Sequence, residues 1–134
     1  MSAISGSDTS SEIAVRKSLF RSGFRYRLHV KNLPGKPDIV LPKYKAVIFV
    51  HGCFWHQHEG CPRSKRPETR KGFWGQKLDV NISRDKRNID QLTAMGWRIA
   101  VVWECAIKKK SIFEQTLFSL ESWIRSDKPE ISIP

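Results

Sequence analysis

Cysteine and histidine are concentrated in one short segment of the chain. Residues 51–61, HGCFWHQHEGC, contain three histidines and two cysteines, and Cys105 supplies the third thiol of the sequence. A closed structural zinc site uses four Cys or His ligands, so this local density favours zinc over a set of unrelated thiols. The predicted ligands are Cys53, His58, Cys61 and Cys105. Spacing alone leaves open which histidine takes part.

Two histidines of this segment, His51 and His56, would then lie outside the zinc site. Histidine titrates near neutral pH and is a common proton-transfer residue, so a catalytic role for at least one is weighed against that of a solvated bystander. Phe54 and Trp55 lie in the same segment. Adjacent aromatic residues usually pack in a core, but flanked by polar residues they could equally wedge between DNA bases. Both alternatives stay open here.

Two carboxylates occupy positions that secondary structure does not explain. Asp38 follows Pro37 at the start of a predicted strand, where aspartate gains nothing from β propensity, and this placement predicts a metal ligand. Asp85 interrupts the apolar stripe of a predicted helix, and a buried carboxylate is costly unless it is paired, hydrogen-bonded or metal-bound. The alternative for Asp85 is a salt bridge to Arg84 or Arg87.

Composition points to a nucleic-acid partner. The 134 residues fit one domain, and 24 Lys and Arg against 13 Asp and Glu give a formal charge of +11, which attracts a polyanion. Five tryptophans add rings on which bases can stack, against the alternative of a merely basic soluble protein. The Ser-rich start, MSAISGSDTSSE, lacks the apolar run of a signal peptide, and no stretch approaches the roughly 18 apolar residues of a membrane span. We therefore expect a cytoplasmic protein without a membrane partner.

The first half of the chain must position these groups with one helix and three strands. N-cap candidates at 8–11 and Gly23 predict a helix over about 10–22. Residues 24–31, FRYRLHVK, alternate apolar with basic, which is typical of a strand with one wet face. After a Pro-Gly turn, the apolar runs 38–41 and 46–50 predict a hairpin. Residues 51–72 show neither period, so something other than a hydrophobic core must order them.

The second half continues with a helix, a buried strand and a last helix. Apolar residues at 78, 82, 89 and 92 predict an amphipathic helix over about 74–95, and 97–103 reads as a buried strand. A last helix is indicated by the stepping of Phe113, Leu117, Leu120 and Ile124. The predicted order is αβββαβα, an α/β fold, with a short N-terminal arm over 1–9, one domain over 10–126 and a C-terminal tail over 127–134.

Together these pieces resemble the very-short-patch-repair (Vsr-type) DNA mismatch endonucleases, which are related to the PD-(D/E)xK restriction endonucleases. The resemblance runs from Met1 to about Ala106. It rests on the segments MSAISGSDTSSE, FRYRLHVKNLPGKPDIVLP, VIFVHGCFWHQHEGC, ETRKGFW, NISRD and GWRIAVVWECA. It implies a single restriction-endonuclease-like domain, with a central mixed β-sheet flanked by helices and a zinc-stapled loop.

The same resemblance implies roles for individual residues. Asp38 would bind the catalytic magnesium together with the backbone carbonyl of Val50, and Glu12 would hold water in the outer shell of the metal. His56 would be the general acid or base, oriented by Asp85, with His51 close to the scissile phosphate. The implied ligands of the structural zinc are again Cys53, His58, Cys61 and Cys105. The implied DNA-intercalating residues are Met1, Phe54, Trp55 and Trp74.

The implied activity is a magnesium-dependent nick 5′ to the T of a T·G mismatch in double-stranded DNA, left by deamination of 5-methylcytosine. We expect a monomer that works in the bacterial cytoplasm in association with the nucleoid. One alternative is a non-catalytic zinc module that binds nucleic acid, but it leaves Asp38 and Asp85 without a purpose. A second alternative is a related nuclease with a different target.

Overall fold

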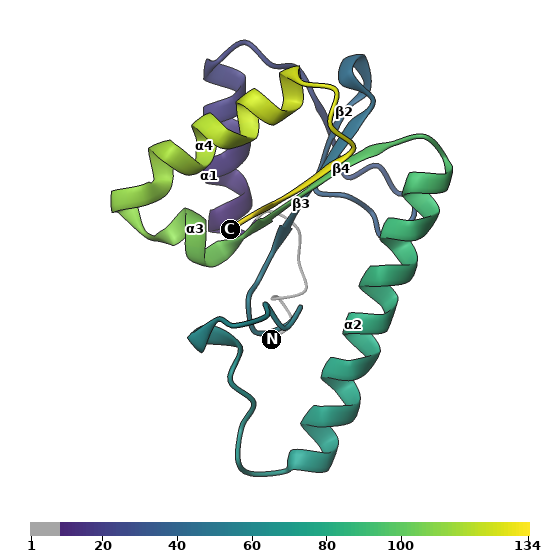
Figure 1. Cartoon of the computed structure of the whole chain (residues 1–134), viewed down its shortest axis with the longest axis vertical. Helices are drawn as coiled ribbons and strands as arrows, with labels where there is room; N and C mark the ends of the chain where they lie inside the picture. Colours follow the sequence, from purple (N-terminus) through teal and green to yellow (C-terminus); the bar gives the residue numbers. More distant parts are fainter. Residues whose placement is uncertain (1–8) are drawn as a thin grey trace.

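A computed structural model describes residues 9–134 as one five-stranded mixed sheet with helices on both sides (Figure 1). The strands lie in chain order: β1 (Arg27–Leu28), β2 (Ile39–Leu41), β3 (Ala46–His51), β4 (Arg98–Trp103) and β5 (Glu130–Ile133). The first three strands pair antiparallel, whereas β3 with β4 and β4 with β5 pair parallel. The mixed sheet flanked by helices that the resemblance implied is confirmed.

The helices divide between the two faces of this sheet. They are α1 (Ser10–Arg21), α2 (Lys71–Ala94), α3 (Glu104–Lys108) and α4 (Lys110–Arg125). In Figure 1, α1, α3 and α4 lie together on one side of the strands and α2 on the other. The parallel pairing of β3 and β4 follows from this arrangement, because the long connection through α2 returns the chain to the same end of the sheet.

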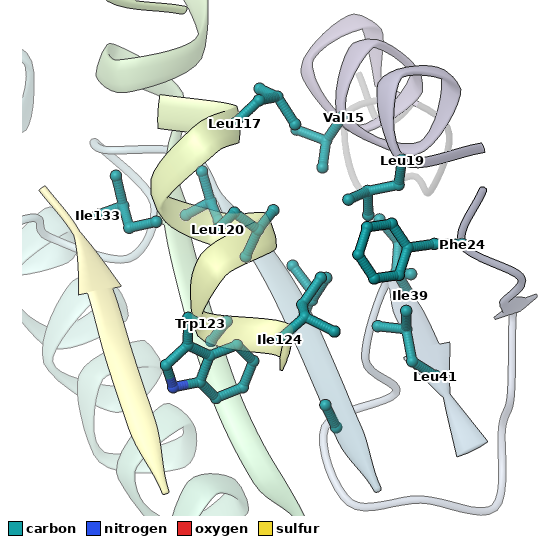
Figure 2. Packing of buried hydrophobic residues seen from close by; sticks show 14 of the residues in the cluster. Val15, Leu19, Phe24, Ile39, Leu41, Leu117, Leu120, Trp123, Ile124 and Ile133 are labelled. Atoms are coloured by element: carbon teal, nitrogen blue, oxygen red, sulfur yellow. The ribbon is translucent and has the colours of Figure 1, made fainter. Parts of the chain in front are cut away.

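Alternating residues of the central strands build a core on each face. Ile39 and Ile48 belong to the core under α1 and α4, while Val40 and Val47 belong to the core under α2. This is the two-residue period of a strand that is buried on both sides. Figure 2 shows the larger core, in which α4 packs Leu117, Leu120, Trp123 and Ile124 against α1 and the strands.

Helix α1 begins and ends where its capping residues predict. The Thr9 side chain accepts a hydrogen bond from the Glu12 amide at 3.2 Å, and Gly23 adopts a φ of 97° just after the helix. A left-handed residue at this point is a common helix stop. The bounds expected for this helix are therefore confirmed to within one residue, and they fix the position of Glu12 in the first turn.

Two expectations about strands need correction. The strand expected over 24–31 is only Arg27–Leu28, because Phe24 turns into the core and His29 has a φ of 56°, which ends the pairing. The tail expected over 127–134 instead contains β5, which pairs parallel with Ile99–Val102 of β4. A strand of four residues is too short for its alternation of apolar and polar side chains to be recognised in the sequence. The strand that pairs with it, β4, also lies some thirty positions earlier in the sequence.

Helix α2 differs from its expected apolar stripe. It begins at Lys71, three residues earlier than expected, and buries Leu78 and Leu92, whereas Ile82 between them is 41% exposed. In Figure 1 the N-terminal half of α2 runs beyond the strands. No helix within residues 9–134 is long and apolar enough to cross a membrane.

The packing of α4 gives a direct test of the fold. Leu120 is fully buried in the larger core, whereas Phe118, two positions earlier, is 72% exposed. Leu120→Ala should lower the free energy of unfolding by about 2–5 kcal/mol, because it removes buried methyl groups and leaves a cavity. Phe118→Ala should change it by about 0.5 kcal/mol or less. Urea unfolding of both variants makes the comparison, and equal losses would show that α4 packs through another face.

Candidate active site and metal centre

The candidate site lies where β3 and β4 end side by side. Their last residues, His51 and Trp103, are paired in the register of the parallel ladder. The loop that carries the Cys/His segment leaves β3 at this point, and α3 follows β4 directly. Adjacent parallel strands bring their carboxyl ends to one edge, so groups far apart in the sequence meet here.

Three cysteines and one histidine converge beside this edge. The sulfur atoms of Cys53, Cys61 and Cys105 and a ring nitrogen of His58 all lie within 4.8 Å of one another. The Sγ atom of Cys105 is 3.6 Å from Nδ1 of His58. The structure thus brings together all four predicted zinc ligands, and His58 is the histidine that reaches them.

The chemistry of this cluster fits a soft divalent metal. All three cysteines are free thiols, and burial, the largest cause, raises the pKa of Cys53 to about 12 and also raises the pKa of Cys105. A thiol in such surroundings loses its proton readily only when a cation binds the sulfur in place of that proton. Four S and N donors this close together match the donor set of a closed tetrahedral zinc site.

His51 and His56 lie face to face next to the metal-binding cluster. Their rings stack with centroids 3.8 Å apart and planes 4° apart. Nδ1 of His56 lies 2.6 Å from Oδ2 of Asp85 on α2, which leaves the Nε2 atom of His56 for proton exchange. Asp85 thus pairs with a histidine of the loop. The alternative prediction, a salt bridge from Asp85 to Arg84 or Arg87, is wrong.

His51 is held as a neutral imidazole. Its side chain is buried, and desolvation, followed by the charge of His56, lowers its pKa well below 6.5. Within residues 9–134 its Nδ1 atom has no hydrogen-bond partner. A neutral ring with an unused nitrogen can accept a proton or a hydrogen bond from a bound molecule.

Asp38 and Glu12 form an acidic pair from two distant elements. Asp38 comes just before β2, and its Oδ2 atom accepts a hydrogen bond from the Val50 amide at 2.7 Å. Glu12 is buried in the first turn of α1, where Arg16 donates to it at 3.2 Å. Burial, followed by the nearby carboxylate of Glu12, raises the pKa of Asp38 to about 7. Crowded carboxylate oxygens of this kind fit a hard cation such as Mg²⁺.

One cavity of about 920 Å³ connects these groups. Basic side chains from several elements line its walls, which suits a phosphate-bearing ligand. On α2, the lining residues Lys77, Asn81, Arg84 and Asn88 recur at spacings of four and three, a polar stripe that the sequence reading missed. The predicted residues that share this cavity are Glu12, Asp38, Val50, His51, Phe54, Trp55, His56 and Asp85.

Phe54 and Trp55, which line the cavity, form an aromatic cluster with Trp74. The Phe54 ring lies 5.1 Å from Trp55 and 5.6 Å from Trp74, centroid to centroid, and Trp55 lies 5.9 Å from Trp74. None of the three belongs to either hydrophobic core, and Trp55 is 37% exposed. Simple core packing therefore does not explain them. Met1, also expected to contact DNA, lies outside the described residues.

Trp103 joins the metal-binding cluster to the histidine pair, a role that sequence reasoning missed. Its ring stacks on His58 with centroids 4.2 Å apart and meets the edge of His51 at 5.2 Å. Its Nε1 atom donates to Ser132 of β5 at 3.1 Å. The only signal in the sequence was its position two residues before Cys105.

These features fit a metal-dependent hydrolase that acts on nucleic acid. Residues 1–63 match the family model described as DNA mismatch endonuclease Vsr. The chain is 42% identical over 126 residues to the DNA mismatch endonuclease Vsr of Escherichia coli K12, covering 92% of this chain and 80% of that protein. It is 45% identical over 117 residues to the type II nicking enzyme V.XorIIP of Xanthomonas oryzae pv. oryzae, covering 87% and 85%.

The type II nicking enzyme V.NmeAIP of Neisseria meningitidis shows the same level of similarity. It is 45% identical over 117 residues, covering 87% of this chain and 83% of that enzyme. The chain belongs to the Vsr family of DNA mismatch endonucleases. The family named from the sequence motifs is therefore confirmed, and with it the class of DNA-nicking hydrolase.

The raised pKa of Asp38 predicts a pH dependence of stability without added divalent cation. A carboxyl with a pKa of 3.8 when unfolded and about 7 when folded holds its proton more tightly in the folded state. The stabilisation of the folded state by this protonated carboxyl is complete below pH 3.8 and is lost as pH rises to about 7. The free energy of unfolding should therefore fall over this range relative to Asp38→Asn, which cannot ionise. Urea unfolding at several pH values tests this, and parallel curves for the two proteins would contradict it.

Proposed function

We propose that the chain nicks one strand of double-stranded DNA 5′ to the T of a T·G mismatch, the product of 5-methylcytosine deamination. The observation that carries the proposal is the meeting of the acidic pair, the histidine pair and the aromatic cluster around one basic cavity. The first two groups suit phosphodiester hydrolysis, and the third suits a weakly stacked base pair.

In this proposal the acidic pair holds magnesium. When bound by Asp38 and the Val50 carbonyl, Mg²⁺ would polarise the phosphoryl oxygen and offset its negative charge. Asp38 is fixed for this task by the Val50 amide, and Glu12 is anchored by Arg16, so that its carboxylate can orient water nearby. The raised pKa of Asp38 supports the assignment, because a bound cation relieves the repulsion between the half-buried carboxylate of Asp38 and the buried carboxylate of Glu12.

The histidine pair handles the proton. Asp85, 2.6 Å from Nδ1 of His56, keeps the proton on that nitrogen and leaves Nε2 to act as general base or acid. His51 is stacked on His56 and neutral, so it can contact the scissile phosphate without competing for the same proton. Because burial disfavours the charged form of His51, the stacked rings of His51 and His56 do not both carry a positive charge.

We assign the metal of the Cys/His cluster as structural zinc. Cys53, His58, Cys61 and Cys105 provide four protein donors and leave no open position for a substrate. The loop that they tie down carries His56, Phe54 and Trp55. Zinc therefore acts through the placement of these residues, with no part in the hydrolysis.

Recognition is assigned to the aromatic cluster. A mismatched pair is weakly stacked, so inserting Phe54, Trp55 and Trp74 beside it costs less than inserting them into matched DNA. Lys and Arg around the cavity supply affinity for phosphates without regard to sequence. We propose that the chain acts as a monomer in the bacterial cytoplasm, at the nucleoid.

A nicking assay on T·G, U·G and matched duplexes, with and without Mg²⁺, tests this function. The parent should nick the T·G duplex only with Mg²⁺ and in preference to matched DNA. Asp38→Ala should abolish nicking but leave DNA binding intact or tighter, because one anion is removed from a positive cavity. Asp90→Ala removes an exposed carboxylate of α2 and should nick like the parent.

Two outcomes would overturn parts of this account. An Asp38→Ala variant that nicks near the parent rate would place the magnesium site elsewhere. Equal nicking of T·G and matched duplexes by the parent would leave a nuclease with a different target.

A further inference from the structure

The turn that carries Phe54 and Trp55 is held from inside by one side chain, Gln57. Its Nε2 atom donates to the Phe54 carbonyl at 2.7 Å and to the Ser64 carbonyl at 3.1 Å. Its Oε1 atom accepts from Nε of Arg66 at 2.8 Å. Both N–H groups and the oxygen of the side-chain amide are thus used, and they connect the turn at Phe54 and Trp55 to Ser64 and Arg66 in the later part of the same loop.

A second set of bonds extends this connection to α2, which carries Trp74. Nη2 of Arg66 donates to Asp79 at 2.8 Å, and Nδ2 of Asn81 donates to the Trp55 carbonyl at 3.2 Å. The guanidinium of Arg66 therefore bridges Gln57 and α2 through two different nitrogens. The Arg66–Asp79 pair is solvent-exposed and adds little stability, so its effect is on geometry.

The backbone at Gln57 supports a positioning role. Gln57 has a φ of 51°, a left-handed conformation that few residues other than glycine adopt. It lies between His56 and His58, so this reversal sends one histidine to the active site and the other to the metal-binding cluster. Local strain of this kind persists where surrounding bonds enforce it, and the three side-chain bonds of Gln57 do so.

We propose that Gln57 is a positioning residue for mismatch recognition, one that holds the Phe54–Trp55 turn against Trp74 before DNA binds. This inference rests on the proposed function, in which these rings insert beside the mismatch. When the three rings are already held together in the free protein, binding does not have to include the entropic cost of ordering them. Matched DNA resists insertion of the rings, so its affinity depends little on whether they are held in place. Gln57 therefore affects the ratio of affinities for T·G and matched duplexes more than it affects overall affinity.

Gln57→Glu is the variant that tests the role. The carboxylate has no hydrogen to donate to the carbonyls of Phe54 and Ser64, yet it still accepts from Arg66, so the loop keeps one of its anchors. Gln76→Glu makes the same chemical change at an exposed position of α2 and controls for added negative charge. Arg66→Lys is a second test if Gln57→Glu does not fold, because lysine cannot bridge Gln57 and Asp79 as the guanidinium does.

Two measurements are made on each protein, together with zinc content and melting temperature. The first is the exciton circular-dichroism signal of the Trp55–Trp74 pair in the DNA-free protein, with Trp74→Phe as the reference that lacks it. The second is the ratio of Kd values for matched and T·G duplexes at one salt concentration. Gln57→Glu should keep its zinc and lose the exciton signal, and its ratio should fall roughly tenfold. Gln76→Glu should match the parent in both.

A Gln57→Glu protein with the parent's exciton signal and ratio would overturn the inference. Loss of zinc from this variant would also overturn it, because Gln57 would then serve the metal-binding cluster. If the parent itself shows no preference for T·G, the proposed function fails, and the exciton signal still decides whether Gln57 positions the rings.

Discussion

The site depends on one constraint: the loop between β3 and α2 has no hydrophobic core of its own. Between residues 52 and 70, Cys53 is the only buried residue, so apolar packing cannot order this segment. The convergence of Cys53, His58 and Cys61 with Cys105 of α3 supplies the missing restraint. In this loop the Cys/His cluster takes the place that leucine and isoleucine have in the cores of the sheet.

Several charged and aromatic groups are positioned as a consequence. Trp103 contacts both His58 of the Cys/His cluster and His51, and His51 stacks on His56. The rings therefore form a continuous contact path from His58 to His56. The opposite wall of the cavity is set by the sheet and α1, which hold Asp38 and Glu12 independently of the loop. The candidate active site therefore has one side on the loop that carries the Cys/His cluster and one side ordered by hydrophobic packing.

Periodicity and local density made most of the fold predictable. Helices α1, α2 and α4, the hairpin and β4 follow from repeats within a few residues, whereas the short helix α3 was not predicted. The Cys/His segment is visible because its members are neighbours. Contacts between remote positions were not visible in local patterns: β5 and the stack of His58 on Trp103 were missed, because both depend on the assembled sheet. The pairing of Asp85 with His56 was expected only through the family resemblance. Glu12 entered only through the family resemblance, since an acidic residue in a first helical turn is common.

The central claim is that the Cys/His cluster orders the loop, and amide hydrogen exchange after metal removal tests it most directly. The purified protein should contain one zinc per chain. Once a chelator removes it, the amides of His56, His58 and Ser64, which are hydrogen-bonded within the loop, should exchange freely. Amides of β3, β4 and α4 should stay protected, and added zinc should restore the loop. Unchanged protection of the loop, or loss of the sheet at the same time, would contradict the account.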